Sequence, residues 1–80
     1  MLNVPQKISG IVHPLVRDVY LKKDFGYNKR AQDVLVIEAS IGNDNKSENS
    51  FYELLMDLQE IELKAEQSVG HIDRVDIVTH

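Results

Sequence analysis

The sequence contains no cysteine and no tryptophan, and its 80 residues include only four glycines and two prolines. Without cysteine there is neither a disulfide framework nor a thiolate metal site. Apolar runs are no longer than about five residues, whereas a membrane-spanning helix needs about 20. We therefore expect no metal, no cofactor and no membrane partner, and we expect a cytoplasmic location because cysteine-free chains need no oxidising compartment.

The residues that are present indicate one small folded domain. Hydrophobic residues make up 42% of the chain and charged residues 28%, which is typical of globular proteins and not of disordered acidic tails. A chain of this length forms a single domain, 1–80, which buries only about 60–65% of the surface that its unfolded form exposes. The stability margin is therefore small, and contact with a partner surface would add to it.

Charge is divided unevenly along the chain. Residues 1–32 contain six Lys or Arg and two Asp, whereas residues 33–80 contain three Lys or Arg and eleven Asp or Glu. Basic and aromatic residues are interleaved between positions 17 and 30. This is the one local cluster of the sequence whose composition suggests a binding function. The modest net charge of −4 thus conceals a dipolar sequence.

Residues 50–68 are predicted to form an amphipathic helix. Ser50 and Glu53 have the spacing of a capping box, and Gly70 is suited to end the helix. Apolar residues recur at helical spacing, which predicts a face packed in the core. The members of this predicted core face are Phe51, Leu54, Leu55, Leu58, Ile61 and Ala65.

A second apolar strip on this helix has two interpretations. Tyr52, Met56 and Leu63 lie about 100° from the middle of the core face. In one interpretation a broad core face continues around the helix beneath a loop. In the other, the strip packs against a second subunit, and these three residues form a self-interface.

Two strands are predicted on either side of the helix. Residues 33–41 form a nearly continuous run of apolar β-formers, which is typical of a central strand. Residues 72–79 alternate and are also interpreted as a strand. Strand, helix and strand then make one unit, whose crossover is right-handed if the two strands are parallel.

The N-terminal third is more ambiguous. Apolar residues between Ile8 and Tyr20 recur at helical spacing, but Gly10 and Pro14 interrupt that pattern and the density of Ile, Val and Tyr favours a strand. We predict a strand at 15–23, joined by the loop 24–32 to the central strand as an antiparallel hairpin, with part of 6–12 as an edge strand. The expected fold is α+β, with the order β-β-α-β after an N-terminal extension.

The hairpin tip is the predicted partner-binding loop. Its basic side chains suit a negatively charged surface, and its aromatic rings suit either a protein or the bases of single-stranded nucleic acid. No ribonucleoprotein motif, GXXG loop or helix-turn-helix spacing supports the nucleic-acid alternative. The residues assigned to this loop are Arg17, Lys22, Lys23, Phe25, Tyr27, Lys29 and Arg30.

No residue pattern indicates an enzyme. His13, His71 and His80 have no recognisable catalytic or metal-ligand spacing relative to the carboxylates, and a turn or cap is the expected role of His13. The expected function is a non-enzymatic protein-interaction or regulatory module of the adaptor or inhibitor type, with self-association. Its acidic helix would dock onto a basic partner or onto the basic tip of another copy.

Overall fold

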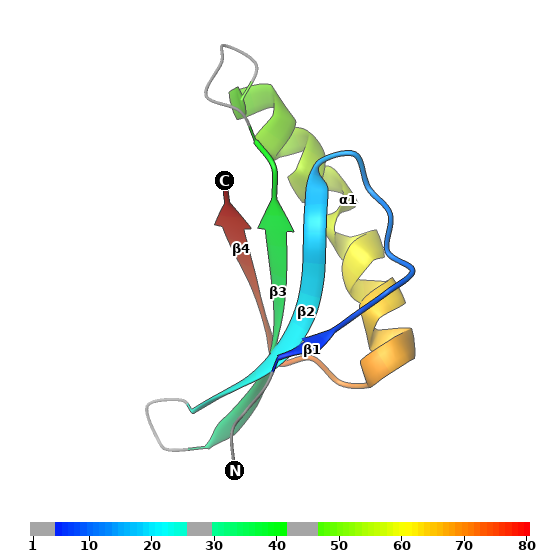
Figure 1. Cartoon of the computed structure of the whole chain (residues 1–80), viewed down its shortest axis with the longest axis vertical. Coiled ribbons are helices and arrows are strands. Elements are labelled where there is room, and N and C mark those ends of the chain that lie inside the picture. The colour runs from blue at the N-terminus through cyan, green and yellow to red at the C-terminus, as the bar shows by residue number, and fades with distance from the viewer. Residues whose placement is uncertain (1–4, 26–29, 42–46) are drawn as a thin grey trace.

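The computed structural model describes residues 5–25, 30–41 and 47–80, and this part of the chain forms a four-stranded mixed sheet with one helix (Figure 1). The fold is α+β, as the sequence predicts. No helix in these segments combines the length and low polarity that crossing a membrane requires. The elements in chain order are β1 (Gln6–Lys7), β2 (Val16–Phe25), β3 (Ala31–Ala39), α1 (Ser47–Val69) and β4 (Arg74–Thr79).

The strands lie in the sheet in the order of the chain, β1-β2-β3-β4. β2 and β3 form the predicted antiparallel hairpin, in which Val19 is opposite Ile37 and Leu21 is opposite Leu35. β4 runs parallel to β3 after the α1 crossover. The prediction of a central strand is confirmed, because β3 has a neighbour on each side.

The ambiguity in the N-terminal third resolves in favour of a strand. β2 extends two residues beyond the predicted end at position 23, because the pairing with β3 continues as far as Phe25 and Ala31. The edge strand is only Gln6–Lys7, at the polar start of the segment 6–12, and does not include the apolar part predicted to form it. Gly10 adopts a φ of +89°, which turns the backbone away from an extended path soon after β1.

The helix is longer than predicted. It begins at Ser47, so Ser50 lies inside the first turn and the prediction that Ser50 caps the helix is wrong. At the other end Gly70 has a φ of +86° and donates its backbone N–H to Glu66 O at 2.8 Å. This left-handed glycine ends the helix as expected.

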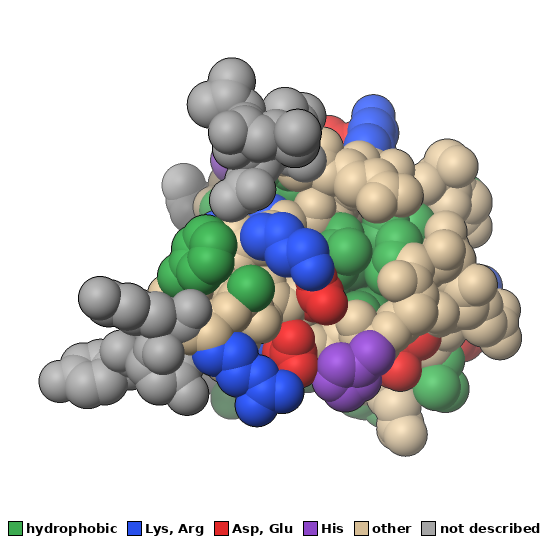
Figure 2. Space-filling model, turned by 90° about the horizontal axis from the view of Figure 1, so that it is seen from below, with side chains coloured by type: hydrophobic (Ala, Val, Ile, Leu, Met, Phe, Trp, Pro, Cys, Tyr) green, Lys and Arg blue, Asp and Glu red, His purple; other side chains and the backbone are tan. Residues whose placement is uncertain are grey.

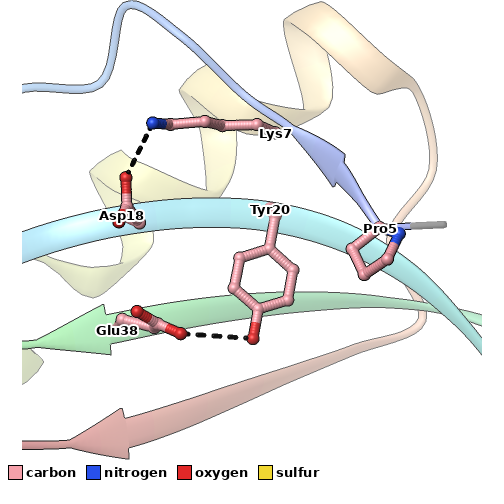
Figure 3. Close-up of a pocket in the computed structure, with 5 residues that line it drawn as sticks. All are labelled: Pro5, Lys7, Asp18, Tyr20 and Glu38. Atoms are coloured by element: carbon pink, nitrogen blue, oxygen red, sulfur yellow. Dashed lines mark hydrogen bonds and ion pairs between the residues drawn. The ribbon is translucent and has the colours of Figure 1, made fainter.

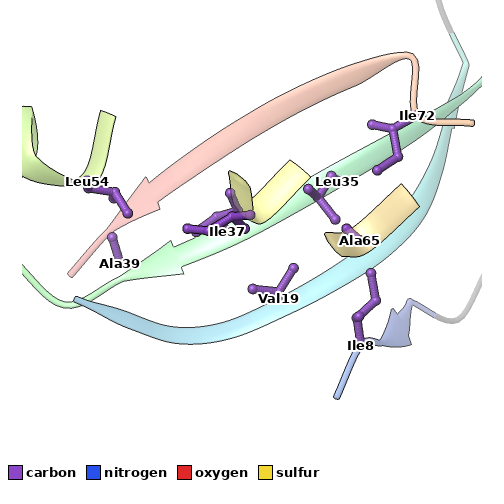
Figure 4. Close-up of a cluster of buried hydrophobic side chains, with 9 residues drawn as sticks. Ile8, Val19, Leu35, Ile37, Ala39, Leu54, Ala65 and Ile72 are labelled. Carbon is purple, nitrogen blue, oxygen red and sulfur yellow. The ribbon is translucent and has the colours of Figure 1, made fainter. Parts of the chain in front are cut away.

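The core lies between α1 and one face of the sheet, which we call the helix face (Figure 4). Leu54, Ile61 and Ala65 of the helix are at most 4% exposed. The prediction that Leu55 belongs to this core face is wrong, since its side chain is 39% exposed. The core cluster consists of Ile8, Val19, Leu35, Ile37, Ala39, Leu54, Ile61, Ala65 and Ile72.

Candidate interaction surfaces

Four large apolar side chains of α1 are exposed. Tyr52 is 56% exposed, Leu55 39%, Met56 84% and Leu63 55%. We call these four residues the outer strip. Each residue advances about 100° around the helix axis. Two side chains that are two positions apart are therefore about 200° apart in one direction and about 160° apart in the other.

The outer strip faces away from the sheet. Tyr52 and Met56 are each two positions from buried Leu54, and Leu63 is two positions from buried Ile61. These side chains therefore point to nearly the opposite side of the helix from the core. The interpretation in which the core face widens to include them beneath a loop does not fit their exposure.

The borders of the outer strip are acidic. α1 contains six carboxylate residues and one lysine. That lysine, Lys64, lies 3.9 Å from Glu60 Oε1 in an i,i+4 pair, and Glu53 is also exposed. A protein surface that packs on the strip therefore meets negative charge along the edges of the contact.

The structure separates the residues assigned to the basic loop. Lys22 and Lys23 point to opposite faces of β2, because successive side chains of a strand alternate. Lys22 lies opposite Val34 and is half-buried, whereas Lys23 forms an ion pair with Asp33. Arg17 lies at the other end of β2, about 27 Å from Phe25 at 3.4 Å per residue.

Phe25 and Arg30 remain at the hairpin end. Phe25 is 62% exposed, and Arg30 is exposed and close enough to Asp73 to help lower the pKa of that carboxyl. Tyr27 and Lys29 fall outside the described residues. Basic and acidic side chains lie next to one another at this end of the molecule (Figure 2).

A cluster of ion pairs occupies the sheet surface that faces away from α1, which we call the open face. Arg74 Nη2 lies 2.9 Å from Asp24 Oδ2, and Arg74 Nε lies 3.1 Å from Asp76 Oδ1. Arg74 also donates to Gln32 Oε1 at 3.3 Å. The hydrogen bond from Arg74 is the main reason why the pKa of Asp24 is below its ordinary value.

Near the cluster, another carboxyl joins two strands. Asp33 donates its backbone N–H to Asp73 Oδ2 at 2.8 Å, and this bond is the largest cause that lowers the pKa of Asp73. His71 Nε2 lies 3.0 Å from the other oxygen of Asp73. These contacts fix the entry into β4 against the start of β3.

A hollow of about 310 Å³ lies on the open face (Figure 3). Lys7 Nζ lies 3.1 Å from Asp18 Oδ1, and the Tyr20 hydroxyl donates to Glu38 Oε1 at 3.4 Å. Pro5 forms the remaining wall. The polar groups of the hollow thus have partners within it, and burial followed by the Glu38 charge raises the pKa of Tyr20.

His13 fastens the N-terminal loop to the helix. Its Nδ1 accepts the Leu15 backbone N–H at 3.1 Å, so Nε2 carries the hydrogen that is donated to Asp57 Oδ2 at 2.7 Å. The Val16 N–H also bonds to the His13 carbonyl at 3.1 Å, which makes the expected turn. In the described segments no three His, Asp or Glu side chains are grouped so that they would bind a metal ion.

Sequence reasoning missed three members of these surfaces. Helical spacing alone assigns Leu55 to the core, although on a helical projection it lies about 60° from Tyr52 and about 100° from Leu54, beside the strip. Asp57 as the partner of His13 and Arg74 as the centre of the ion-pair cluster depend on contacts 44 and 50 residues apart in the chain. No local pattern signals such contacts.

Comparison of the chain with protein-family models, with curated proteins and with solved structures finds no match. The function is therefore argued from the surfaces. Of these, the hollow and the ion-pair cluster have their polar groups satisfied within the chain. The outer strip differs, because large apolar side chains there contact water.

Proposed function

We propose that this protein is a small non-enzymatic interaction module, of the adaptor or inhibitor type, that binds another protein through the outer strip of α1. The observation that carries the proposal is the exposure of Met56, 84%, on the side of the helix opposite Leu54. Large apolar side chains that are exposed together on one side of a helix are typical of protein-binding surfaces. Met56 buries little of its surface in the fold.

Charge selects the kind of partner. An amphipathic helix binds such a strip through apolar residues spaced by three and four positions. The acidic borders of the strip favour a helix whose apolar row is flanked by Lys and Arg. The proposed partner is therefore a basic amphipathic segment of another protein, in the cytoplasm.

The same charges act against self-pairing of the strip. Two copies of α1 packed through this strip would bring the carboxylates that border it, such as Glu53 and Glu60, close to an identical set, and like charges across an interface cost free energy. The self-interface expected at Tyr52, Met56 and Leu63 stays a prediction. Its dependence on salt should be opposite to that of binding to a basic partner. Added salt would strengthen self-pairing of the strip and weaken its binding of a basic partner.

A synthetic helical peptide tests the proposal. The probe carries a Leu row flanked by Lys and Arg, and the control peptide carries the same row flanked by Glu. At ~50 mM salt we expect the full-length protein to bind the basic peptide, as measured by calorimetry, and to bind it at least tenfold more weakly when the salt is raised about tenfold. No heat of binding with the basic peptide, or equal binding of both peptides, would contradict the proposal.

A pair of variants locates the binding site. Met56→Asp places a charge in the middle of the outer strip, and Ser68→Asp adds the same charge to an exposed position of α1 about 120° around the helix from Met56. We expect the first substitution to weaken binding of the basic peptide at least tenfold, because a charge desolvated in an apolar contact is costly. The second should leave binding unchanged or slightly tighter. Equal effects of the two variants would place the peptide elsewhere.

The second candidate function is binding of single-stranded nucleic acid at the hairpin end. The exposed ring of Phe25 favours it, since such rings stack on bases. The ion pair of Lys23 with Asp33 reduces the free positive charge available there. A labelled oligonucleotide at ~50 mM salt decides the matter: binding that falls on Phe25→Ala and on added salt would support it, and no binding would exclude it.

A further inference from the structure

The two edges of the sheet differ in how well they are protected. At one edge β1 has two residues and follows Pro5, and Lys7 is exposed there. At the other edge β4 has six residues without proline or lysine, and its two charged residues, Arg74 and Asp76, pair with each other. No further strand pairs with β4 among the described residues. Long edge strands without such protection pair readily with another chain.

The backbone of β4 shows which groups are free to pair. His80 directs both its backbone groups towards β3: its N–H bonds to Ala39 O at 2.9 Å and its carbonyl accepts from Ile41 N–H at 3.3 Å. The register between β3 and β4 is constant over residues 74–79. The direction of the backbone N–H and C=O groups alternates from one residue of a strand to the next. These groups therefore point away from β3, towards the free edge, at Val75, Ile77 and Thr79.

From this geometry we infer that two copies of the protein pair through β4, antiparallel and about a two-fold axis at Ile77. Ile77 then lies opposite Ile77 of the second copy as a hydrogen-bonded pair, and Val75 lies opposite Thr79. These three pairs exchange about six backbone hydrogen bonds. The two sheets become one of eight strands.

Charge distinguishes this register from the one centred on Asp76. With the axis at Ile77, Asp76 lies opposite Val78 of the second copy. A shift that puts the axis at Asp76 would place two Asp76 side chains directly opposite each other in the close, non-hydrogen-bonded position, where like charges are destabilising. An axis at Val75 avoids this clash but pairs fewer residues of β4.

The apolar side chains of β4 gain from the pairing. Val75 and Ile77 on the helix face are only half-buried, and Val78 on the open face is 41% exposed. α1 crosses the sheet from the end of β3 towards the β1 side and leaves β4 at the opposite edge (Figure 1). A second copy adds neighbours where the helix supplies few, and it leaves the outer strip available to a different partner.

Single cysteines test the register, because the chain has none of its own. In the proposed dimer the two Cα atoms at position 77 are about 5.5 Å apart, which suits a disulfide. We expect oxidised Ile77→Cys to form a covalent dimer on non-reducing gels. Thr79→Cys, on the same strand, should not form a covalent dimer, because the two Cα atoms at position 79 lie about 14 Å apart in the proposed dimer. Cross-linking at position 79 but not 77 would overturn the register.

Mass measurements test the dimer itself and separate this inference from the proposed function. By light scattering we expect the unmodified protein and Met56→Asp to be dimers, and Thr79→Pro, which removes an outward N–H at an exposed edge position, to be monomeric and folded by circular dichroism. A monomeric unmodified protein at ~100 μM, or a dimer lost in Met56→Asp alone, would overturn the inference. Calorimetry with the basic peptide is a separate measurement, because it probes the outer strip and not β4.

Discussion

The two faces of β3 bury apolar side chains to the same extent in different ways. On the helix face Leu35 and Ile37 are 0% exposed beneath α1. On the open face Val34 and Val36 are 0% and 2% exposed, although the described segments place no helix above them. One face is covered by another element, and the other is covered by its own side chains.

Cross-strand neighbours provide the cover on the open face. Lys22 and Arg74 flank Val34, and Tyr20 and Asp76 flank Val36. Long polar side chains cover apolar surface with their aliphatic stems or rings while their polar ends stay in water. Arg74 is bound to two carboxylates, so the burial of Val34 beneath its side chain depends on particular ion pairs. The helix face depends instead on the volume and shape of packed side chains.

The largest expected effect is at the helix face. Leu35→Ala removes a fully buried side chain and leaves a cavity that the sheet and helix cannot close, so the free energy of unfolding should fall by about 2–5 kcal/mol. Urea denaturation measures this change. Leu63→Ala is the matched control at an exposed position, with an expected change within about 0.5 kcal/mol. Similar losses in both variants would show that the outer strip is packed in the folded protein.

The same substitution on both faces isolates the difference between them. Val19 on the helix face is 3% exposed and Val36 on the open face is 2% exposed. We expect Val19→Ala to cost about 1.5–3 kcal/mol and Val36→Ala less than about 1.5 kcal/mol, because the side chains over Val36 are free to move inward or admit water. Equal costs in urea denaturation would mean that the polar cover is as rigid as the core.

Acid should weaken the open face in particular. The pKa of Asp24 is lowered from 3.8, chiefly by its hydrogen bond from Arg74. A carboxyl whose pKa is lowered on folding adds stability above its unfolded pKa, and this stability is lost as the pH falls through the lower, folded pKa. Asp24→Asn should therefore lose less stability than the unmodified protein as the pH falls below 3.8, which urea midpoints at each pH would measure.

An additive control accompanies the acid experiment. The pKa of Asp73 is lowered mainly by the Asp33 backbone N–H, a cause that does not involve Arg74. Asp73→Asn should reduce the acid sensitivity further when it is combined with Asp24→Asn. Arg74→Gln should act like Asp24→Asn, since it removes the main cause of that shift. An unchanged slope in all three variants would show that these carboxyls do not govern acid unfolding.

Local patterns were enough to predict much of the fold. The apolar run at Val34–Ile37 predicts a central strand, and the spacing of Leu54, Ile61 and Ala65 predicts the packed face of the helix. The start of the helix was misplaced because the Ser50–Glu53 spacing resembles a cap while helical hydrogen bonding already begins at Ser47. Boundaries depend on backbone contacts that residue types specify only weakly.

The surfaces were less predictable than the fold. Helical spacing predicts a strip at Tyr52, Met56 and Leu63, but the exposure of this strip depends on which helix residues the sheet covers. The basic residues that are close in the sequence are far apart in the structure. Lys22 and Lys23 point to opposite faces of β2, because strand side chains alternate, and Arg17 lies at the far end of that strand. Ion pairs with distant carboxylates, such as Lys23 with Asp33, then cancel part of the positive charge.

The smallest expected effect is at alkaline pH on the open face. Burial, followed by the charge of Glu38, raises the pKa of Tyr20 above 10.0. Because the folded state retains this proton more strongly, the contribution of Tyr20 is present below pH 10.0 and is lost as the pH rises through the folded pKa. Tyr20→Phe should therefore lose less stability than the unmodified protein above that pH.

The substitution Glu38→Gln separates the two causes that raise the pKa of Tyr20, which are burial and the charge of Glu38. It keeps an oxygen that accepts the Tyr20 hydroxyl hydrogen but removes the charge, so the alkaline loss should shrink without disappearing, because burial is the larger cause. The quantity to compare is the difference in urea midpoint between each variant and the unmodified protein, since lysines titrate in the same range. A Glu38→Gln curve identical to that of Tyr20→Phe would mean that the carboxylate, and not the burial of the ring on the open face, controls this proton.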